Sequence, residues 1–421
     1  MAFQDIRKIR NRLSPEEIRL LVFIAIGIIV LLAVNILLAR ILPGGEWLSL
    51  RWNGARAFLF EDVGSYSTTI AERVQQLVYG RNAFSSEYGY VLNDPFYIAL
   101  LYTPLALFSD FSIARGIWML FAEAALIGSV MFAVRLSEWE PPFWMMTLLI
   151  IFALFSYYSL QSLVSASPAI FFLFLSLSIL LALRSYNDEL AGALLFLIAY
   201  QWEVNALFFL FIMVAVIASK RWGVFGGFGM SLFVLMALAF LTNSGWGLPY
   251  LRAVLSDWYD GAHLNLNSHV SLWFSNSKLP IASIIAVALG IIVLLEWINA
   301  LRSNFRHIVW AASLSLAVTP LLGFAIFESN YVVLILPFFL ALALAWERWR
   351  RRRVFITVLV LGTAFIVPYI FYAIQMSEPQ RIYSDLLTLL PPIAAIIALY
   401  WMRWQVVRSS RPWLEQVGAI P

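Results

Sequence analysis

The chain has 421 residues, of which 62% are hydrophobic, 12% are charged and none is cysteine. A soluble domain carries about twice that charged fraction, so the composition excludes a disordered chain, a nucleic-acid-binding domain and an ordinary soluble enzyme. Without cysteine there is no disulfide and no thiol nucleophile, and three histidines leave little for a histidine-rich metal site. The excess apolar side chains must face lipid, which predicts a polytopic membrane protein.

Within residues 1–421, most of the chain consists of successive apolar runs, each about long enough to span a bilayer. Residues 1–17 are charged, and the long run behind them predicts an uncleaved signal-anchor helix. The clearest runs are 18–42, 114–134, 142–157, 168–184, 222–243, 280–301, 308–326, 331–347, 354–375 and 384–403. The run 190–219 is interrupted at 201–205, and 94–109 is short and contains two prolines. We therefore predict a single all-α membrane domain of about 10–12 transmembrane or re-entrant helices.

Lysine and arginine positions predict the orientation of these helices. Basic residues cluster in the N-terminus, at Lys220-Arg221 and at Arg348 with Arg350–Arg353, and such clusters favour the cytoplasmic side. We interpret the last cluster as an anchor against anionic lipid. This membrane topology requires that the segment 190–219 enters and leaves the membrane on the cytoplasmic side. It also requires that 94–109 does not fully cross the membrane.

This orientation predicts a multi-pass protein of the plasma membrane with both ends, 1–17 and 404–421, in the cytoplasm. Two long segments, 43–93 and 244–279, then lie on the non-cytoplasmic face. Long ordered loops in compact proteins are usually functional. We therefore expect the active site on the outer face.

The first outer segment opens with an acidic residue at the expected membrane boundary. Glu46 follows the first apolar run directly, behind Gly44 and Gly45. An ionisable group at such a depth is a functional candidate, here a general base with a raised pKa. The alternative is a solvated carboxylate paired with Arg51 or Arg56. Farther along, 66–79 has apolar residues on one helical face and predicts a helix lying in the interface.

Short motifs in this segment carry a family resemblance. They are Pro43-Gly44-Gly45-Glu46-Trp47, Gly54-Ala55-Arg56, Gly64-Ser65-Tyr66, Tyr79-Gly80-Arg81-Asn82-Ala83, Asn93-Asp94-Pro95-Phe96-Tyr97 and Ala114-Arg115-Gly116-Ile117-Trp118. Over 43–118 the chain resembles the start of glycosyltransferase family 87, the polyprenyl-phosphate-dependent membrane mannosyltransferases of the GT-C fold. The resemblance implies a GT-C-like bundle and a lipid-linked sugar donor.

The chain departs from the family pattern at four places. Glu46 stands where the family usually has Asp, and its spacing to Trp52 is one residue longer. Ser65 replaces a Pro before Tyr66, and Glu203 stands where a Lys is often found. A catalytically inactive relative, or one of different specificity, is therefore an open alternative.

The second outer segment is rich in aromatic, amide and basic side chains. Aromatic faces stack on sugars, amides bind hydroxyl groups, and His and Lys can stabilise a leaving phosphate. The candidates for binding substrate there are His263, Asn267, His269 and Lys278. An interfacial aromatic belt with a solvated loop is the alternative. The two histidines are six residues apart, which does not favour a shared metal site.

The resemblance and the residues together predict a membrane glycosyltransferase. It would transfer a sugar, mannose by resemblance, from a polyprenyl phosphate to a lipid or glycan acceptor by an inverting displacement. Glu46 is the expected base, with Glu61 and Asp62 as further acidic candidates. The remaining predicted substrate-binding residues are Arg51, Trp52, Arg56, Tyr66, Arg81 and Asp94.

Two other functional predictions complete this interpretation. We expect no cofactor and no obligatory metal, because no Asp-x-Asp motif is present. The expected partners are the lipid-linked donor, the acceptor and membrane lipids, without nucleic acid. A transporter or lipid flippase is the rival from another class, and it would need ionisable residues near the bilayer midplane.

Overall fold

A computed structural model describes residues 15–61, 63–260, 264–274, 279–377 and 381–407. Every regular element in these ranges is a helix. The first half contains α1 (Pro15–Ile41), α2 (Glu46–Phe60), α3 (Thr68–Tyr79), α4 (Phe96–Ala106), α5 (Phe111–Leu136), α6 (Phe143–Phe155), α7 (Tyr157–Val164), α8 (Ala169–Arg184), α9 (Asp188–Ile198) and α10 (Trp202–Ala218). The second half contains α11 (Trp222–Thr242), α12 (Gly247–Asp260), α13 (Leu266–Trp273), α14 (Ile281–Leu301), α15 (Phe305–Val318), the 3-10 helices η2 (Thr319–Leu322) and η3 (Glu328–Leu334), α16 (Ile335–Arg348), α17 (Arg353–Ser377) and α18 (Arg381–Val407).

Among the described residues, eight helices are long and apolar enough to cross a membrane, or nine if the bent pair α6 and α7 forms one span. The pair is bent by 47°. Three shorter apolar helices, α4, α8 and α10, cover the other predicted runs. The prediction of an all-α polytopic membrane protein is confirmed. The number of full-length spans is lower than the number of apolar runs because several runs form short or broken helices.

The irregular segments fall where the sequence predicts them. The run 190–219 divides into α9 and α10, which are separated at Ala199–Gln201. The run 94–109 forms only the 11-residue helix α4, with Pro104 inside it. The amphipathic stretch 66–79 forms α3, as predicted. Its Ile70 and Val74 are buried against α2.

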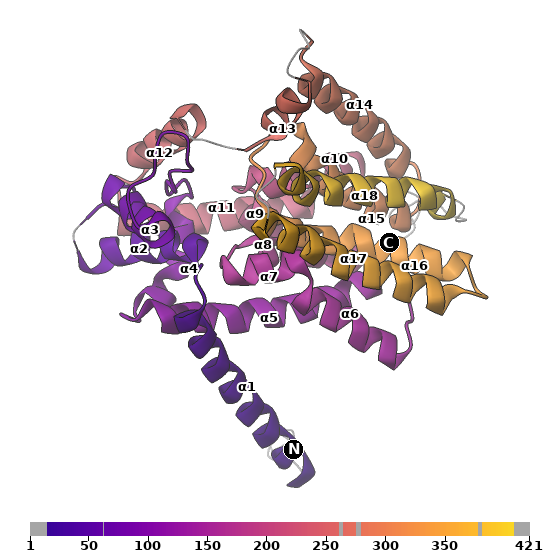
Figure 1. Ribbon diagram of the computed structural model, residues 1–421, viewed down its shortest axis with the longest axis horizontal. Helices are drawn as coiled ribbons and strands as arrows, with labels where there is room; N and C mark the ends of the chain where they lie inside the picture. The colour runs from indigo at the N-terminus through magenta and orange to yellow at the C-terminus, as the bar shows by residue number, and fades with distance from the viewer. Residues whose placement is uncertain (1–14, 62, 261–263, 275–278, 378–380, 408–421) are drawn as a thin grey trace, which may run out of the picture.

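Peripheral and central helices differ sharply in burial. Of the most apolar 18-residue stretch of α1, only 6% is buried inside the protein. The corresponding share is 89% in the segment formed by η3 and α16. Since the exposed helices carry apolar side chains around most of their surface, their partner must be lipid. Figure 1 shows α1 extending away from the body of the protein. The core is therefore built on α5, α8, α15 and α16, with α1, α11 and α17 at the periphery.

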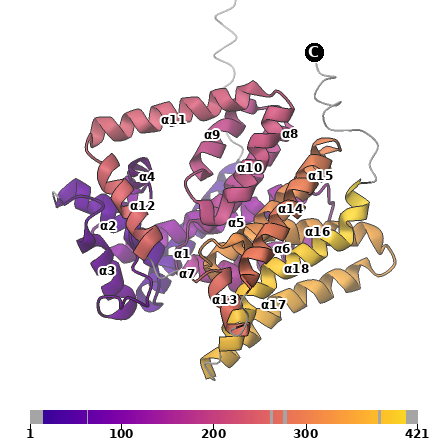
Figure 2. The same ribbon diagram turned by 90° about the horizontal axis from the view of Figure 1, so that it is seen from above.

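Small residues allow two helices to approach closely at one edge. Figure 2 shows α11 running along one side of the bundle, with α9 beside it. A Cβ added at Gly192 of α9 would lie 1.9 Å from the Val224 carbonyl, and one at Gly227 would lie 1.9 Å from the Glu189 carbonyl. Backbone contact of this kind is typical of helix packing inside membranes.

Several short helices gather at one end of the molecule. Figure 1 shows α2, α3 and α12 together there, beside one end of α11. These helices belong to the two long loops between apolar spans. This end of the molecule contains Glu46 and the residues around it.

Candidate functional site

The turn before α2 is held by a buried arginine. Gly44 and Gly45 have φ angles of 112° and 84°, which favour glycine. The Arg115 side chain of α5 is only 2% exposed. It donates to the carbonyls of Ala39, Leu42, Pro43 and Val164. Arg115 thereby ties the end of α1 to α7 and fixes the direction in which α2 begins.

This turn places Glu46 at the first position of α2, where the helix N-terminus favours a negative charge. Burial raises the pKa of Glu46 from 4.5 to about 7, although a backbone hydrogen bond and the charge of Arg115 act in the opposite direction. Within the described residues no basic side chain lies within 4.0 Å of the Glu46 carboxylate. The alternative in which Arg51 or Arg56 neutralises Glu46 is therefore not what the structure shows.

Aromatic rings surround the residue next to Glu46. The Trp47 ring lies 5.8 Å from Tyr88, 5.9 Å from Tyr90 and 4.9 Å from Phe327. Tyr90 also interacts electrostatically with Glu46. We call these four residues the aromatic wall. Such faces can stack against a sugar ring beside the carboxylate.

Arg51 and Asp94 form a buried ion pair with each other. The Arg51 Nε lies 2.6 Å from Asp94 Oδ2, and Arg51 Nη2 donates to Asp94 Oδ1 at 3.1 Å. A further guanidinium nitrogen donates to the Trp47 carbonyl at 2.9 Å. Both side chains are almost completely buried. The pair joins α2 to the start of α4, so its observed role is to hold the outer segment together.

Two other predicted binding residues fasten α2 to the end of α4. Trp52 Nε1 donates to the Leu105 carbonyl at 3.2 Å. Arg56 donates to the carbonyls of Ala106 and Phe108, and its guanidinium lies 5.0 Å from the Trp52 ring. These carbonyls lie at or just beyond the end of α4, where carbonyl groups lack the usual partners within a helix.

The remaining predicted residues of the first segment make local contacts. Glu61 forms an ion pair with Arg73 of α3 at 2.6 Å. The Tyr66 hydroxyl donates to the Asp94 carbonyl at 2.8 Å. Arg81 pairs with Glu87 at 2.7 Å. Asp62 lies outside the described residues, so the structure gives it no contact.

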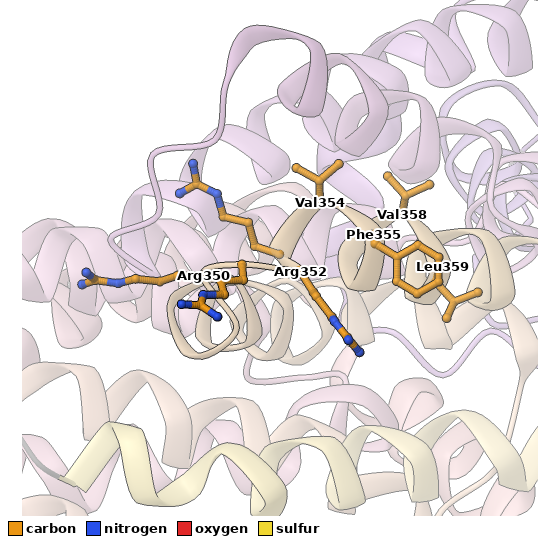
Figure 3. A pocket seen from close by; sticks show the side chains of 8 residues that line it. Arg350, Arg352, Val354, Phe355, Val358 and Leu359 are labelled. Carbon is orange, nitrogen blue, oxygen red and sulfur yellow. The ribbon is translucent and has the colours of Figure 1, made fainter.

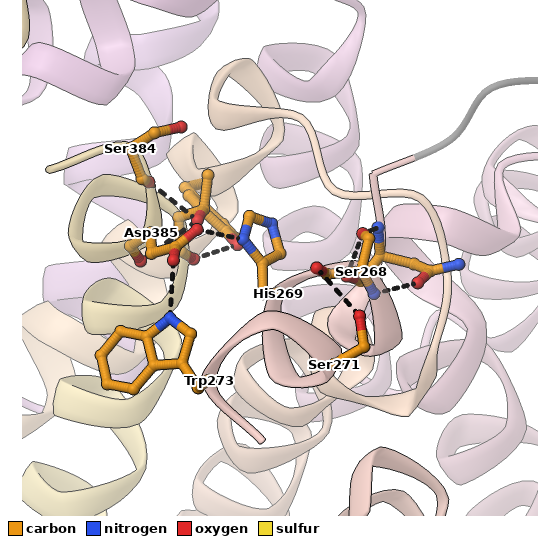
Figure 4. Close-up of polar contacts among 9 residues, drawn as sticks. Ser268, His269, Ser271, Trp273, Ser384 and Asp385 are labelled. Atoms are coloured by element: carbon orange, nitrogen blue, oxygen red, sulfur yellow. Dashed lines mark hydrogen bonds and ion pairs between the residues drawn. The ribbon is translucent and has the colours of Figure 1, made fainter. Parts of the chain in front are cut away.

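The second outer segment contains a buried His–Asp pair. His269 Nδ1 lies 2.6 Å from Asp385 Oδ1, and Trp273 Nε1 donates to Asp385 Oδ2 at 2.7 Å (Figure 4). The pair holds α13 against the start of α18. In the part of the chain that the structure describes, the buried Nε2 has no hydrogen-bond partner. Asn267 is exposed on α13, whereas His263 and Lys278 lie outside the described ranges.

Residues 326–327 connect the two outer segments. Phe327 packs on Trp47, the residue that follows Glu46. The neighbouring Ile326 N–H donates to the Leu264 carbonyl at 2.7 Å. Leu264, in the middle of the second segment, therefore lies close to the aromatic wall.

The structure also places further acidic residues near this wall. Glu203, at the first turn of α10, interacts electrostatically with Asp257 of α12, Asp94 and Arg51. Asn93 Nδ2 donates to Asp257 Oδ2 at 2.7 Å. In the sequence, Glu203 is singled out only as a departure from the family pattern. The only signal in the sequence was the polar break at 201–205, which does not identify its neighbours.

A further carboxylate, that of Glu328, lies at the start of η3. Glu328 accepts a hydrogen bond from the Tyr157 hydroxyl, and Gln161 donates to the same hydroxyl at 3.2 Å. Since Phe327 belongs to the aromatic wall, Glu328 is next to that wall in the chain.

The described residues contain no group of three or more His, Cys, Asp or Glu side chains placed to hold a metal ion. No protein-family model matches the sequence, and no curated protein or solved structure matches it. The functional argument consequently rests on the geometry around Glu46.

Proposed function

We propose that the protein is a membrane glycosyltransferase that uses a polyprenyl-phosphate sugar donor. The observation that carries the proposal is a half-buried carboxylate, Glu46, with a pKa near 7 and no ion-pair partner among the described residues. It lies beside an aromatic wall and just beyond the end of the apolar helix α1. A base poised near neutral pH beside a sugar-stacking surface suits hydroxyl activation.

The location supports a lipid-linked donor. The polyprenyl tail can stay in the bilayer while its phosphate and sugar reach the end where α2, α3 and α12 gather. On this proposal that end is the non-cytoplasmic face of the plasma membrane. Mannose is the sugar favoured by the family resemblance, and the acceptor is a lipid or glycan hydroxyl.

The proposed reaction is a single inverting displacement. Glu46 accepts the proton of the acceptor hydroxyl, whose oxygen forms a bond to the anomeric carbon. The bond from that carbon to the phosphate oxygen breaks, and the polyprenyl phosphate leaves with the electron pair. A carboxylate that takes up a proton near neutral pH can serve this step and release the proton afterwards.

We assign the departing phosphate to the second outer segment. Arg51 and Arg56 are already occupied by Asp94 and by backbone carbonyls. The candidates that remain are His263, His269 and Lys278. The contact between Ile326 and Leu264 brings the middle of this segment toward the aromatic wall.

Paired groups inside the spans argue against the transporter alternative. Glu123 of α5 accepts a hydrogen bond from Asn35 of α1 at 3.0 Å. Glu296 of α14 accepts two from Arg403 of α18 at 2.9 and 3.0 Å. Contacts of this type join helices to one another, and they account for these polar groups without a transport path.

The direct test is transfer of radiolabelled mannose from polyprenyl-phosphate-mannose. Purified protein in nanodiscs would receive a membrane-lipid extract as acceptor. We expect label to move to lipid with the wild type and not with Glu46→Gln. Glu61→Gln is the matched control, because it removes an exposed acid from the same segment and should keep activity. Full activity of Glu46→Gln would refute the assignment of the base.

A further inference from the structure

The turn between α16 and α17 concentrates positive charge on the surface. Arg350–Arg353 line an open surface pocket of about 670 Å³ together with Val354, Phe355, Val358 and Leu359. Figure 3 shows these apolar side chains on α17 next to the turn that carries Arg350 and Arg352. The pocket is far along the chain from Glu46 and is not needed for the proposed reaction.

The arginines of this turn have no acidic partner. Among the described residues, no carboxylate lies within 4.0 Å of the guanidinium nitrogens of Arg350–Arg353. Glu347, the nearest acidic residue in the chain, is paired with Arg306 at 2.6 Å. Four adjacent cations repel one another, so an anion bound there would relieve that repulsion.

Tryptophan side chains hold the two flanks of the turn. The Arg348 guanidinium lies 5.2 Å from the Trp349 ring, and that of Arg353 lies 4.8 Å from the Trp346 ring. Trp349 also contacts Trp401 of α18 at 6.1 Å. Trp401 is 62% exposed. Tryptophan is enriched at the membrane–water interface, which indicates that this turn lies at the level of the lipid headgroups.

The apolar part of the pocket belongs to a lipid-facing span. Val354, Phe355, Val358 and Leu359 are exposed on the first turns of α17. Only 11% of the most apolar 18-residue stretch of α17 is buried inside the protein. An occupant of the whole pocket must therefore combine an anionic group with hydrocarbon.

We propose that the Arg350–Arg353 turn and the start of α17 form a binding site for an anionic phospholipid. The phosphate would contact Arg350–Arg352, and an acyl chain would lie along Val354 and Val358. Free phosphate carries the same charge but leaves the apolar part of the pocket uncovered. The site is independent of the proposed catalysis.

The test measures lipid retention by native mass spectrometry. The full chain would be released from nanodiscs of phosphatidylcholine that contain a minor fraction of phosphatidylglycerol. The wild type should retain phosphatidylglycerol in excess of its share in the nanodisc. Each basic residue near a lipid surface contributes about fivefold in affinity, so Arg350→Gln with Arg352→Gln should reduce that excess by about tenfold or more.

A second double variant distinguishes binding at this pocket from a general effect of positive charge on the protein. Lys220→Gln with Arg302→Gln removes two exposed basic residues outside the pocket and should retain the enrichment. Arg350→Lys with Arg352→Lys keeps the charge and should retain most of it. Equal loss in both Gln variants, or no loss in either, would overturn the proposal. Displacement of the lipid by millimolar inorganic phosphate would also overturn it, because free phosphate would then suffice as the ligand.

Discussion

Glu46 combines partial burial with a negative charge that a backbone hydrogen bond and the charge of Arg115 offset only in part. The folded-state pKa of about 7 lies above the ordinary value of 4.5, so the folded protein holds this proton more tightly than the unfolded chain. Between those two values folding takes up a proton, and stability therefore falls as pH rises through the window. Above pH 7, where Glu46 is ionised in both states, the destabilisation caused by burying its charge reaches its full size.

Glu46→Gln should consequently stabilise the folded protein at alkaline pH and not at acidic pH. Near pH 8 we expect a gain of about 1–3 kcal/mol in the free energy of unfolding, because the shift of the pKa sets the upper limit. Near pH 4.5 the difference should disappear. Thermal unfolding of both proteins in the same nanodiscs measures this. A gain of equal size at both pH values would mean that the Glu46 carboxylate is not desolvated.

The Arg51–Asp94 pair is a second residue-level feature that can be tested. Asp94→Asn should lower the free energy of unfolding by about 3–5 kcal/mol, because a buried guanidinium loses its counter-charge. Arg51→Met combined with Asp94→Leu should lose less than Asp94→Asn alone. Denaturation of the wild type and these two variants gives the comparison. A loss in the double variant that equals or exceeds the loss in Asp94→Asn would show that the cost does not come from an unpaired buried charge.

At the level of elements, the direction of α2 depends on the Gly44-Gly45 turn. A Cβ at Gly44 would lie 2.6 Å from the Val164 carbonyl oxygen, and the φ of 112° disfavours any other residue. Gly44→Ala should therefore destabilise the protein by about 1–3 kcal/mol and displace Glu46. Sugar transfer should fall by at least tenfold, since 1.4 kcal/mol of lost transition-state stabilisation corresponds to that factor.

Gly64→Ala provides the control for this turn. Gly64 lies in the same outer segment, and an added Cβ there meets no atom within 4 Å. Its stability and transfer rate should stay close to those of the wild type. If Gly44→Ala behaved like Gly64→Ala, the turn would not position the base.

The short helices also show where sequence patterns were informative. The short run 94–109 forms the 11-residue α4. The polar break predicted at 201–205 lies slightly earlier, at 199–201, and residues 202–205 form the first turn of α10. The amphipathic pattern of α3 predicted its helix. These features depend on local composition, which a single sequence contains.

Contacts between distant parts of the chain could not be predicted in the same way. Arg51 meets Asp94 across 43 positions, and His269 meets Asp385 across 116. Arg51 and Arg56 were candidates for substrate binding, because the sequence does not reveal that Asp94 and the end of α4 occupy them. The neighbours of Glu203 could not be predicted for the same reason. Glu46 could be proposed as a candidate because its position at the end of an apolar run is a local property.

At the scale of the whole molecule, the orientation in the membrane remains a prediction from the basic residues. The chain has no cysteine, so single introduced cysteines report accessibility without a background. Ser86→Cys, near Arg81, should react with a membrane-impermeant maleimide added to intact cells. Ser185→Cys, between α8 and α9, should react only after the cells are permeabilised. The reverse pattern would invert the topology and place Glu46 in the cytoplasm.

The pH dependence of mannose transfer tests the role of Glu46 as the base most directly. The rate constant for transfer, measured under single-turnover conditions in nanodiscs between about pH 5 and pH 9, reports the protonation state of the base. With a Glu46 pKa of about 7, we predict a rate that rises with pH and reaches half its maximum near pH 7. A rate that is independent of pH over this range, or that falls as pH rises, would contradict the proposed role of Glu46.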